Sequence, residues 1–341
     1  MKRRDFLALG ALGAMGIGAL NRLHAAGDVA QNRRKPHFGQ FHGVVSVTVT
    51  PYHDDHSIDL ETSSALFQRI ANAGVDGLFL AGSTGDMGLL GVDERLAVVK
   101  AGRGAIGDQT KIYAGASDYS IELMVENTKK FADAGADVAV IMAPLMFFKF
   151  SQAELIPFLT KIADQSALPV LLYHHVRVST PIELETIEAV REHPNIIGMK
   201  ETGANYERTT ELLRCADGYD FIFMQGNEPY VVDSLQAGAD GVLSALAGVW
   251  PELFVELVAT ARTDQTDRFR AAAATLNGMC DVFKIMPTSE SFSYFGWTLK
   301  RMLQYRGWLD NTNVRMPGFT PNTDWETQLT TFLAEHDFPK A

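Results

Sequence analysis

The residues of this 341-residue sequence that are suited to carbonyl chemistry stand at the ends of short apolar runs. A neutral lysine amine can attack a ketone and form an imine, and a phenol or hydroxyl nearby can pass the protons that this reaction needs. The candidates are Lys200, Tyr173, the pair Ser83-Thr84, and the pair Asn227-Glu228.

Lys200 closes the run Ile196-Ile197-Gly198-Met199-Lys200. Strict alternation along a strand predicts that Lys200 shares its face with Gly198 and Ile196. If that face lies inside a barrel, the poorly solvated ammonium loses its proton more readily, which supplies the nucleophilic amine. A solvated lysine at a strand end is the simpler interpretation of this position alone, because lysine is rarely buried.

Two further elements lie at comparable positions. Tyr173 ends the preceding run, and neighbouring parallel strands lie about 4.8 Å apart, so its phenol can come close to the Lys200 amine. The stretch Ala81-Gly82-Ser83-Thr84-Gly85-Asp86 offers hydroxyls and backbone N–H groups that suit a carboxylate. A barrel-rim tyrosine and an ordinary glycine-rich turn are the alternatives for these two elements.

Elements that can position such residues alternate along the chain from Gly43 onward. Short apolar, β-branched runs predict eight strands, and amphipathic stretches such as Leu60–Ala73, Ser120–Ala134 and Glu183–Glu192 predict helices between them. Three Ala-Gly-Val/Ala-Asp turns predict helix ends at Gly74, Gly135 and Gly238. The predicted strands are Val44–Thr50, Gly77–Ala81, Lys111–Ala116, Val138–Ala143, Pro169–His174, Ile196–Lys200, Phe221–Gln225 and Gly241–Ala245.

This alternation predicts an α/β fold, a (β/α)8 TIM barrel over residues 41–263. A doubly wound open sheet is the alternative, but Thr50-Pro51-Tyr52-His53 after the first strand is not a glycine-rich phosphate loop. Beyond Arg262 the pattern is purely helical through Phe269–Phe283, Ser289–Tyr305 and Asp324–Glu335. We expect a C-terminal helical extension over residues 264–341.

Taken together, these motifs resemble those of the dihydrodipicolinate synthase / N-acetylneuraminate lyase family of pyruvate-dependent class I aldolases. The resemblance covers about residues 43–262, and its most specific part is Gly-x-Lys-Glu-Thr at the expected distance after a strand-end tyrosine. It is carried by Thr50-Pro51, Gly82-Ser83-Thr84-Gly85-Asp86, Glu94-Arg95, Tyr173, Gly198-Met199-Lys200-Glu201-Thr202 and Gly241-Val242-Leu243-Ser244.

The resemblance implies a lyase that forms an imine between Lys200 and pyruvate or a related 2-keto acid, without any cofactor. Tyr173 and Ser83 would relay protons, and Ser83, Thr84, Gly82 and Leu243 would bind the substrate. The family also implies a homo-oligomer, a dimer or a tetramer.

Several positions depart from the family pattern. His174 stands where Asn is usual, Asp86 replaces the commoner Glu, and Val178, beside Arg177, stands where lysine-pathway synthases carry an arginine. The family's second relay tyrosine falls in Pro144-Leu145-Met146-Phe147-Phe148, which has no hydroxyl. A barrel that binds a keto acid or sugar acid with impaired catalysis is therefore the alternative function.

A metal-dependent barrel enzyme is a further alternative. His174 and His175 are adjacent and should point to opposite faces of a strand, so they cannot share one metal ion. His42 and His53 flank the first strand, but no His-x-His or His-Glu-x-x-His spacing is present. Because a catalytic zinc ion needs three convergent ligands, we predict no metal site.

The first 26 residues form a processing segment. Arg3-Arg4-Asp5-Phe6-Leu7 resembles a twin-arginine export signal, an apolar run extends to about Leu20, and residues 24–26 offer a cleavage site. This run is too short for a membrane span. We expect export to the periplasm, a linker over residues 27–40, and no membrane span after cleavage; an uncleaved anchor is the alternative.

The net charge argues against a nucleic-acid-binding protein, and the cysteine content argues against a disulfide framework or a cysteine metal motif. The formal net charge of −11 argues against a nucleic-acid partner, since such a surface repels phosphate. Cys215 and Cys280 fit neither a metal motif nor a disulfide framework, which predicts two isolated buried thiols. The expected partner is a small-molecule 2-keto acid.

Overall fold

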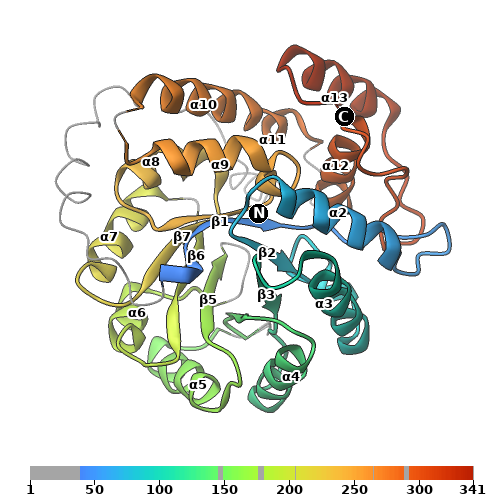
Figure 1. Cartoon of the computed structure of the whole chain (residues 1–341). Helices are drawn as coiled ribbons and strands as arrows, with labels where there is room; N and C mark the ends of the chain where they lie inside the picture. The colour runs from blue at the N-terminus through green and yellow to red at the C-terminus, as the bar shows by residue number, and fades with distance from the viewer. Residues whose placement is uncertain are drawn as a thin grey trace, which may run out of the picture.

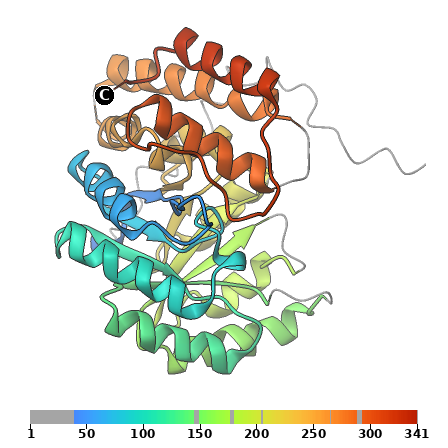
Figure 2. The same ribbon diagram turned by 90° about the vertical axis from the view of Figure 1, so that its right-hand side faces the viewer.

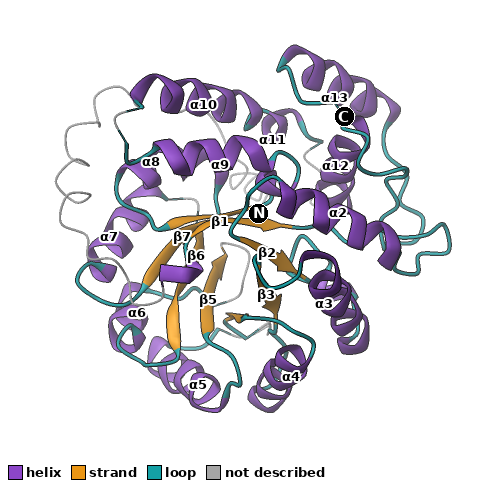
Figure 3. Cartoon of the chain, in the orientation of Figure 1, coloured by secondary structure: helices purple, strands orange, loops and turns teal. Residues whose placement is uncertain are grey.

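Eight parallel strands form a closed barrel, in chain order, with β8 paired to β1. The computed structural model describes residues 39–144, 149–175, 180–203, 205–263, 265–287 and 292–340. Helices surround the strands (Figures 1 and 3), so the predicted (β/α)8 barrel is confirmed. The strands are β1 (Gly43–Val47), β2 (Gly77–Leu80), β3 (Lys111–Gly115), β4 (Val138–Met142), β5 (Val170–His175), β6 (Ile196–Thr202), β7 (Ile222–Gln225) and β8 (Gly241–Ser244).

The helices begin and end where the sequence provides caps. Asp59 and Ser120 accept hydrogen bonds from backbone N–H groups three residues on, at the starts of two helices. Gly74, Gly135 and Gly238 have φ values of 89°, 93° and 96°, as the predicted helix-ending turns require. The barrel helices are α2 (Leu60–Asn72), α3 (Val92–Ile106), α4 (Ile121–Asp133), α5 (Gln152–Gln165), α6 (Leu184–Val190), α7 (Tyr206–Ala216), α8 (Val231–Gln236) and α9 (Pro251–Thr260).

The strands separate two apolar layers. One set of side chains fills the barrel interior, including Val47, Phe79, Tyr173, Ile222 and Leu243. The alternate set packs outward against the helices. Burial on both faces explains why the strands are continuous apolar runs in the sequence.

Strand β6 contains a bulge that the alternation rule did not predict. Its pairing with β5 shifts register, so that Val170 pairs with Ile196 but Leu171 pairs with Gly198. Ile197 therefore points inward and Ile196 outward, so the prediction that Ile196 shares the face of Lys200 is wrong. The extra residue restores Lys200 to the inner side, next to Tyr173.

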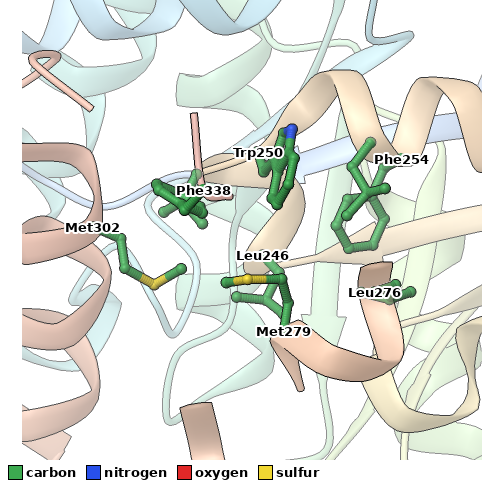
Figure 4. Close-up of a pocket in the computed structure, with 9 residues that line it drawn as sticks. Leu246, Trp250, Phe254, Leu276, Met279, Met302 and Phe338 are labelled. Atoms are coloured by element: carbon green, nitrogen blue, oxygen red, sulfur yellow. The ribbon is translucent and has the colours of Figure 1, made fainter. Parts of the chain in front are cut away.

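Helices of the C-terminal extension gather over one side of the barrel, beside α9 and α2 (Figures 1 and 2). They are α10 (Thr266–Met279), α11 (Val282–Ile285), α12 (Phe292–Tyr305) and α13 (Thr323–Glu335). Figure 4 shows the apolar contact between the extension and the barrel. The Phe338 and Trp250 rings meet edge-on there, with their centroids 5.3 Å apart.

Two properties of the chain follow from these elements. Cys215 and Cys280 are both buried and free, as predicted. Among the residues with described positions, no helix has the length and apolar character to cross a membrane.

Candidate active site

Lys200 and Tyr173 lie side by side inside the barrel. They are partners in the register of β5 and β6, and only 4% of Lys200 and 2% of Tyr173 is exposed. The Lys200 Nζ atom lies 4.1 Å from the Tyr173 ring centroid and 5.2 Å from the Phe79 ring centroid. The structure thus holds an amine in a mostly aromatic, poorly solvated environment at the carboxyl-terminal end of the strands, where barrel enzymes carry their active sites.

The loop after β2 brings a hydroxyl to this pair. Ser83 Oγ lies 3.4 Å from the Tyr173 hydroxyl. Gly82 packs against the Phe79 ring so closely that a Cβ atom would lie 2.6 Å from ring carbons. The structure therefore places Ser83, Tyr173 and Lys200 together, as the sequence predicted.

Thr84 and Leu243 complete the predicted set. Thr84 is buried in the same loop as Ser83, and Leu243 belongs to the apolar interior of the barrel. The loop is strained, because Ala81 and Asp86, neither of them glycine, have φ values of 48° and 62°. Left-handed backbone at such residues persists where surrounding contacts hold it, commonly at functional sites.

Gly226, which follows β7, leaves the space that the Lys200 side chain occupies. A Cβ atom at Gly226 would lie 2.7 Å from Lys200 Cε and 2.4 Å from Thr202 Oγ1. Glycine at this position is therefore a condition for the observed path of the lysine side chain.

The C-terminal extension contributes side chains to the surroundings of the Ser83 loop. The Tyr52 hydroxyl donates to Asp86 at 2.8 Å, and Lys300 Nζ lies 4.3 Å from the Tyr52 ring centroid. Burial raises the pKa of Asp86, an effect that the Lys300 charge partly offsets, and burial lowers the pKa of Lys300 to about 8. Arg315 joins the same region by pairing with Glu94 at 2.7 Å.

A second polar cluster lies on the outer side of the same strands. His174 Nδ1 accepts a hydrogen bond from the Ile182 N–H at 3.2 Å, while Nε2 faces Glu201 Oε1 at 3.8 Å. Burial raises the pKa of Glu201 to about 7 although Arg208 pairs with it, and burial lowers the pKa of His174 to about 3. The separation of 3.8 Å is too long for a hydrogen bond, and burial is the main cause of both pKa shifts.

His175 lies on the inner side, as expected for the residue two positions after Tyr173. The two rings meet edge-on with centroids 5.9 Å apart, and His175 is partly exposed. The prediction that His174 and His175 occupy opposite faces is confirmed. Within the described ranges, no group of three or more His, Cys, Asp or Glu side chains is arranged to hold a metal ion.

Asn227 and Glu228 connect the ends of neighbouring strands. Asn227 Nδ2 donates to the Gly203 carbonyl at 2.6 Å. Glu228 Oε1 accepts from Ser244 Oγ at 2.8 Å and from the Ala245 N–H at 3.0 Å. In the structure these two residues fix the ends of β6, β7 and β8.

Some predicted positions lie outside the described residues, namely Met146–Phe148, Arg177 and Val178. Conversely, sequence reasoning missed Gly226, Lys300 and the contact of His175 with Tyr173. The position of Gly226 just after a predicted strand was a usable signal, whereas nothing local in the sequence connects Lys300 to Asp86.

The chain is similar in sequence to known proteins. The sequence model of the dihydrodipicolinate synthetase family matches residues 40–336. A 4-hydroxy-tetrahydrodipicolinate synthase of Haloarcula marismortui is 32% identical over 232 residues, which are 68% of this chain and 75% of that protein.

Solved structures show the same fold. YagE, a prophage protein of the dihydrodipicolinic acid synthase family from E. coli K12 in complex with pyruvate, has a TM-score of 0.80 and 24% identity. That comparison covers 87% of this chain and 99% of YagE. A monomeric dihydrodipicolinate synthase variant has a TM-score of 0.80 and 23% identity, over 88% of this chain and 98% of the variant.

Proposed function

The chain belongs to the dihydrodipicolinate synthetase family, and from this premise we propose that it is a lyase acting on pyruvate or a related 2-keto acid through a Lys200 imine. The observation that carries the proposal is the buried Lys200 amine, 4.1 Å from the Tyr173 ring centroid at the carboxyl-terminal mouth of the barrel. A lysine amine held at the site of a bound ketone can attack the keto carbon and form an imine.

The reaction follows from this geometry. Lys200 attacks the keto carbon, water leaves, and an imine forms. The imine withdraws electrons, so a proton leaves the adjacent carbon and an enamine results. The enamine carbon then attacks an aldehyde, whose oxygen takes up a proton, and water finally releases Lys200. The same steps in reverse cleave the carbon–carbon bond.

Tyr173 and Ser83 serve as the proton carriers, since their hydroxyl oxygens are 3.4 Å apart and the Tyr173 ring centroid lies 4.1 Å from the Lys200 amine. The Ser83-Thr84 loop, with Gly82 packed on Phe79, receives the carboxylate of the keto acid, and Leu243 forms part of the apolar wall. The pyruvate bound to YagE is consistent with a keto acid as the first substrate.

The acceptor we propose is an aldehyde or a sugar-acid fragment other than the lysine-pathway aldehyde. The motivation is Val178, which stands where the lysine-pathway synthases carry an arginine for the carboxylate of the aldehyde. A dehydratase that works through the same imine is the other form of this proposal.

Borohydride trapping tests the imine directly. The protein is incubated with pyruvate, reduced, digested, and searched for a reduced pyruvyl adduct by peptide mass spectrometry. We expect the adduct on Lys200, and none on Lys300, which is equally buried and serves as a control in the same digest. Absence of an adduct on Lys200 in folded protein, with several keto acids tried, would contradict the proposal.

Turnover separates a lyase from a binding barrel. An adduct on Lys200 without turnover of any aldehyde or sugar-acid substrate would favour the alternative, a barrel that binds a keto acid or sugar acid with impaired catalysis. For an active enzyme, Lys200→Ala should abolish turnover and leave the melting temperature nearly unchanged.

We also propose export by the twin-arginine route to the periplasm, on the basis of Arg3-Arg4-Asp5-Phe6-Leu7; residues 1–38 lie outside the described part of the chain. Replacing both arginines by lysine should retain the precursor in the cytoplasm, which cell fractionation would measure. Unchanged periplasmic protein would contradict this proposal. Homo-oligomerisation likewise remains a proposal, since a monomeric variant of a relative exists; light scattering of the purified protein tests it.

A further inference from the structure

The proposed imine chemistry requires protons to move between a buried site and water. Formation of the imine needs a proton on the departing oxygen, and formation of the enamine releases a proton from the adjacent carbon. Tyr173 is placed to handle both steps, but only 2% of it is exposed. Ser83 is partly exposed and lies 3.4 Å from its hydroxyl, and a basic group at the mouth of the barrel would provide a further connection with solvent.

His175 has the position that this connection requires. It is the last residue of β5, two residues after Tyr173 and on the same inner face, so it stands nearer to the mouth of the barrel. The two rings meet edge-on at 85° with centroids 5.9 Å apart, and His175 is partly exposed to solvent. An imidazole can accept a proton on one ring nitrogen and release a proton from the other.

The adjacent histidine is arranged differently. His174 points to the outer side of the strand, is 4% exposed, and its Nδ1 is occupied by the Ile182 N–H. The strand thus places one histidine inside the site and the other in the packing behind it, which provides a natural control.

We propose that His175 carries protons between Tyr173 and solvent during the imine–enamine interconversion. This inference rests on the proposed function of Lys200. In each passage the neutral imidazole takes up one proton from the site and returns one proton to water, or the reverse. The imidazole is therefore neutral again after the passage, and the site has lost or gained the one proton that the imine–enamine step releases or consumes.

Exchange of the pyruvate methyl protons tests the inference without knowledge of the acceptor. In D2O the enzyme should replace these protons with deuterium through the enamine, and NMR follows the loss of the methyl signal. We expect His175→Ala to exchange at least about 100-fold more slowly, the usual effect of losing a general acid–base group. The amount of borohydride-trapped Lys200 adduct at equilibrium should stay the same.

Chemical rescue separates proton transfer from a structural role. Imidazole added to the buffer should raise the exchange rate of His175→Ala, because the deleted side chain leaves space at a partly open position. It should not rescue His175→Phe, in which the ring fills that space. His174→Asn, in which the change lies on the other face, should exchange without need of rescue.

The outcomes are distinct. Exchange by His175→Ala at the wild-type rate, or a slow rate that imidazole does not raise, would overturn the inference while the Lys200 imine stands. A smaller amount of adduct in His175→Ala with unchanged exchange per adduct would also overturn it, since His175 would then only shape the site. No adduct in the wild-type protein would overturn the proposed function, and the inference with it.

Discussion

Replacing Gly198 by alanine should remove Lys200 from its position in the barrel. Gly198 lies in the β6 bulge, directly after Ile197, the residue left without a partner on β5, and a Cβ atom at Gly198 would lie 2.1 Å from the Ile222 carbonyl oxygen and 2.7 Å from the Ile222 nitrogen. Both are backbone atoms of the neighbouring strand β7, so no side-chain rotation relieves the overlap. Either β6 and β7 separate locally or β6 loses its bulge.

Both responses move the Lys200 amine. Without the bulge, strict alternation would turn Lys200 outward, into the position that fully buried Met199 now occupies. An unpaired ammonium buried there costs several kcal/mol, so local separation of the strands is the cheaper response. The Gly198 φ of 154° adds about 1–3 kcal/mol for a residue with a side chain.

Overpacking adds roughly 1–3 kcal/mol more, so the free energy of unfolding should fall by about 2–6 kcal/mol. A loss of about 3 kcal/mol lowers the melting temperature by roughly 6–12 °C in a large domain. Thermal denaturation measures this change, and borohydride trapping with pyruvate measures the position of the amine. We expect the rate of adduct formation at Lys200 to fall at least about 100-fold in the protein that remains folded.

Gly74→Ala is the matched control. Gly74 also has a left-handed φ, 89°, but no atom lies within 4 Å of a Cβ built there. It should lose about 1–2 kcal/mol of stability and keep the wild-type trapping rate. If Gly198→Ala melts like the wild type and forms the Lys200 adduct at the same rate, the reasoning about the bulge is refuted.

Three further variants test the surroundings of the site. Gly226→Ala should slow trapping at Lys200 at least about tenfold with a destabilisation under about 2 kcal/mol, because the added methyl group displaces Lys200 Cε; adduct kinetics and thermal denaturation measure this, and wild-type kinetics would contradict it. His174→Asn should lose less free energy of unfolding than the wild type when the pH is lowered. Burial lowers the pKa of His174 to about 3, so the unfolded chain binds a proton below about pH 6.5 that the folded chain does not. This histidine therefore contributes stability that is present above pH 6.5 and lost as the pH falls towards 3, up to about 2–3 kcal/mol at pH 4.5; urea denaturation at pH 7 and 4.5 compares the two proteins, and equal acid loss would oppose the assignment. Phe338→Ala should cost about 3 kcal/mol and expose the C-terminal end to limited proteolysis, because it empties the contact with Trp250; unchanged protease resistance would argue against that contact.

The strands and their neighbours could be predicted from the sequence because the relevant signals are local. All eight predicted strands lie within three residues of the observed bounds at each end. The approach of Tyr173 to Lys200 followed from the spacing of parallel strands, once each residue was placed at a strand end.

The inward orientation of Lys200 does not follow from strict alternation along β6. The alternation rule counted Ile196 and Lys200 on one face, and the structure places Ile196 outside and Lys200 inside. A bulge adds one residue to one strand, and its only trace in the sequence is a glycine, which many regular strands also contain. The family resemblance, not the count, was the sound reason to assign Lys200 to the interior.

The contacts that support the Ser83 loop could not be predicted from local sequence, because they join residues far apart in the chain. Lys300 and Arg315 come from the C-terminal extension, yet they lie against Tyr52, whose hydroxyl donates to Asp86 in the strained Ser83 loop. A left-handed backbone at Ala81 and Asp86 persists only if tertiary contacts hold it. Because Lys300 and Arg315 pack on Tyr52, which donates to Asp86, the extension is part of the framework around the Ser83 loop. The geometry of the site thus depends on contacts between residues more than 200 positions apart in the sequence. The residues at the strand ends alone do not predict these contacts.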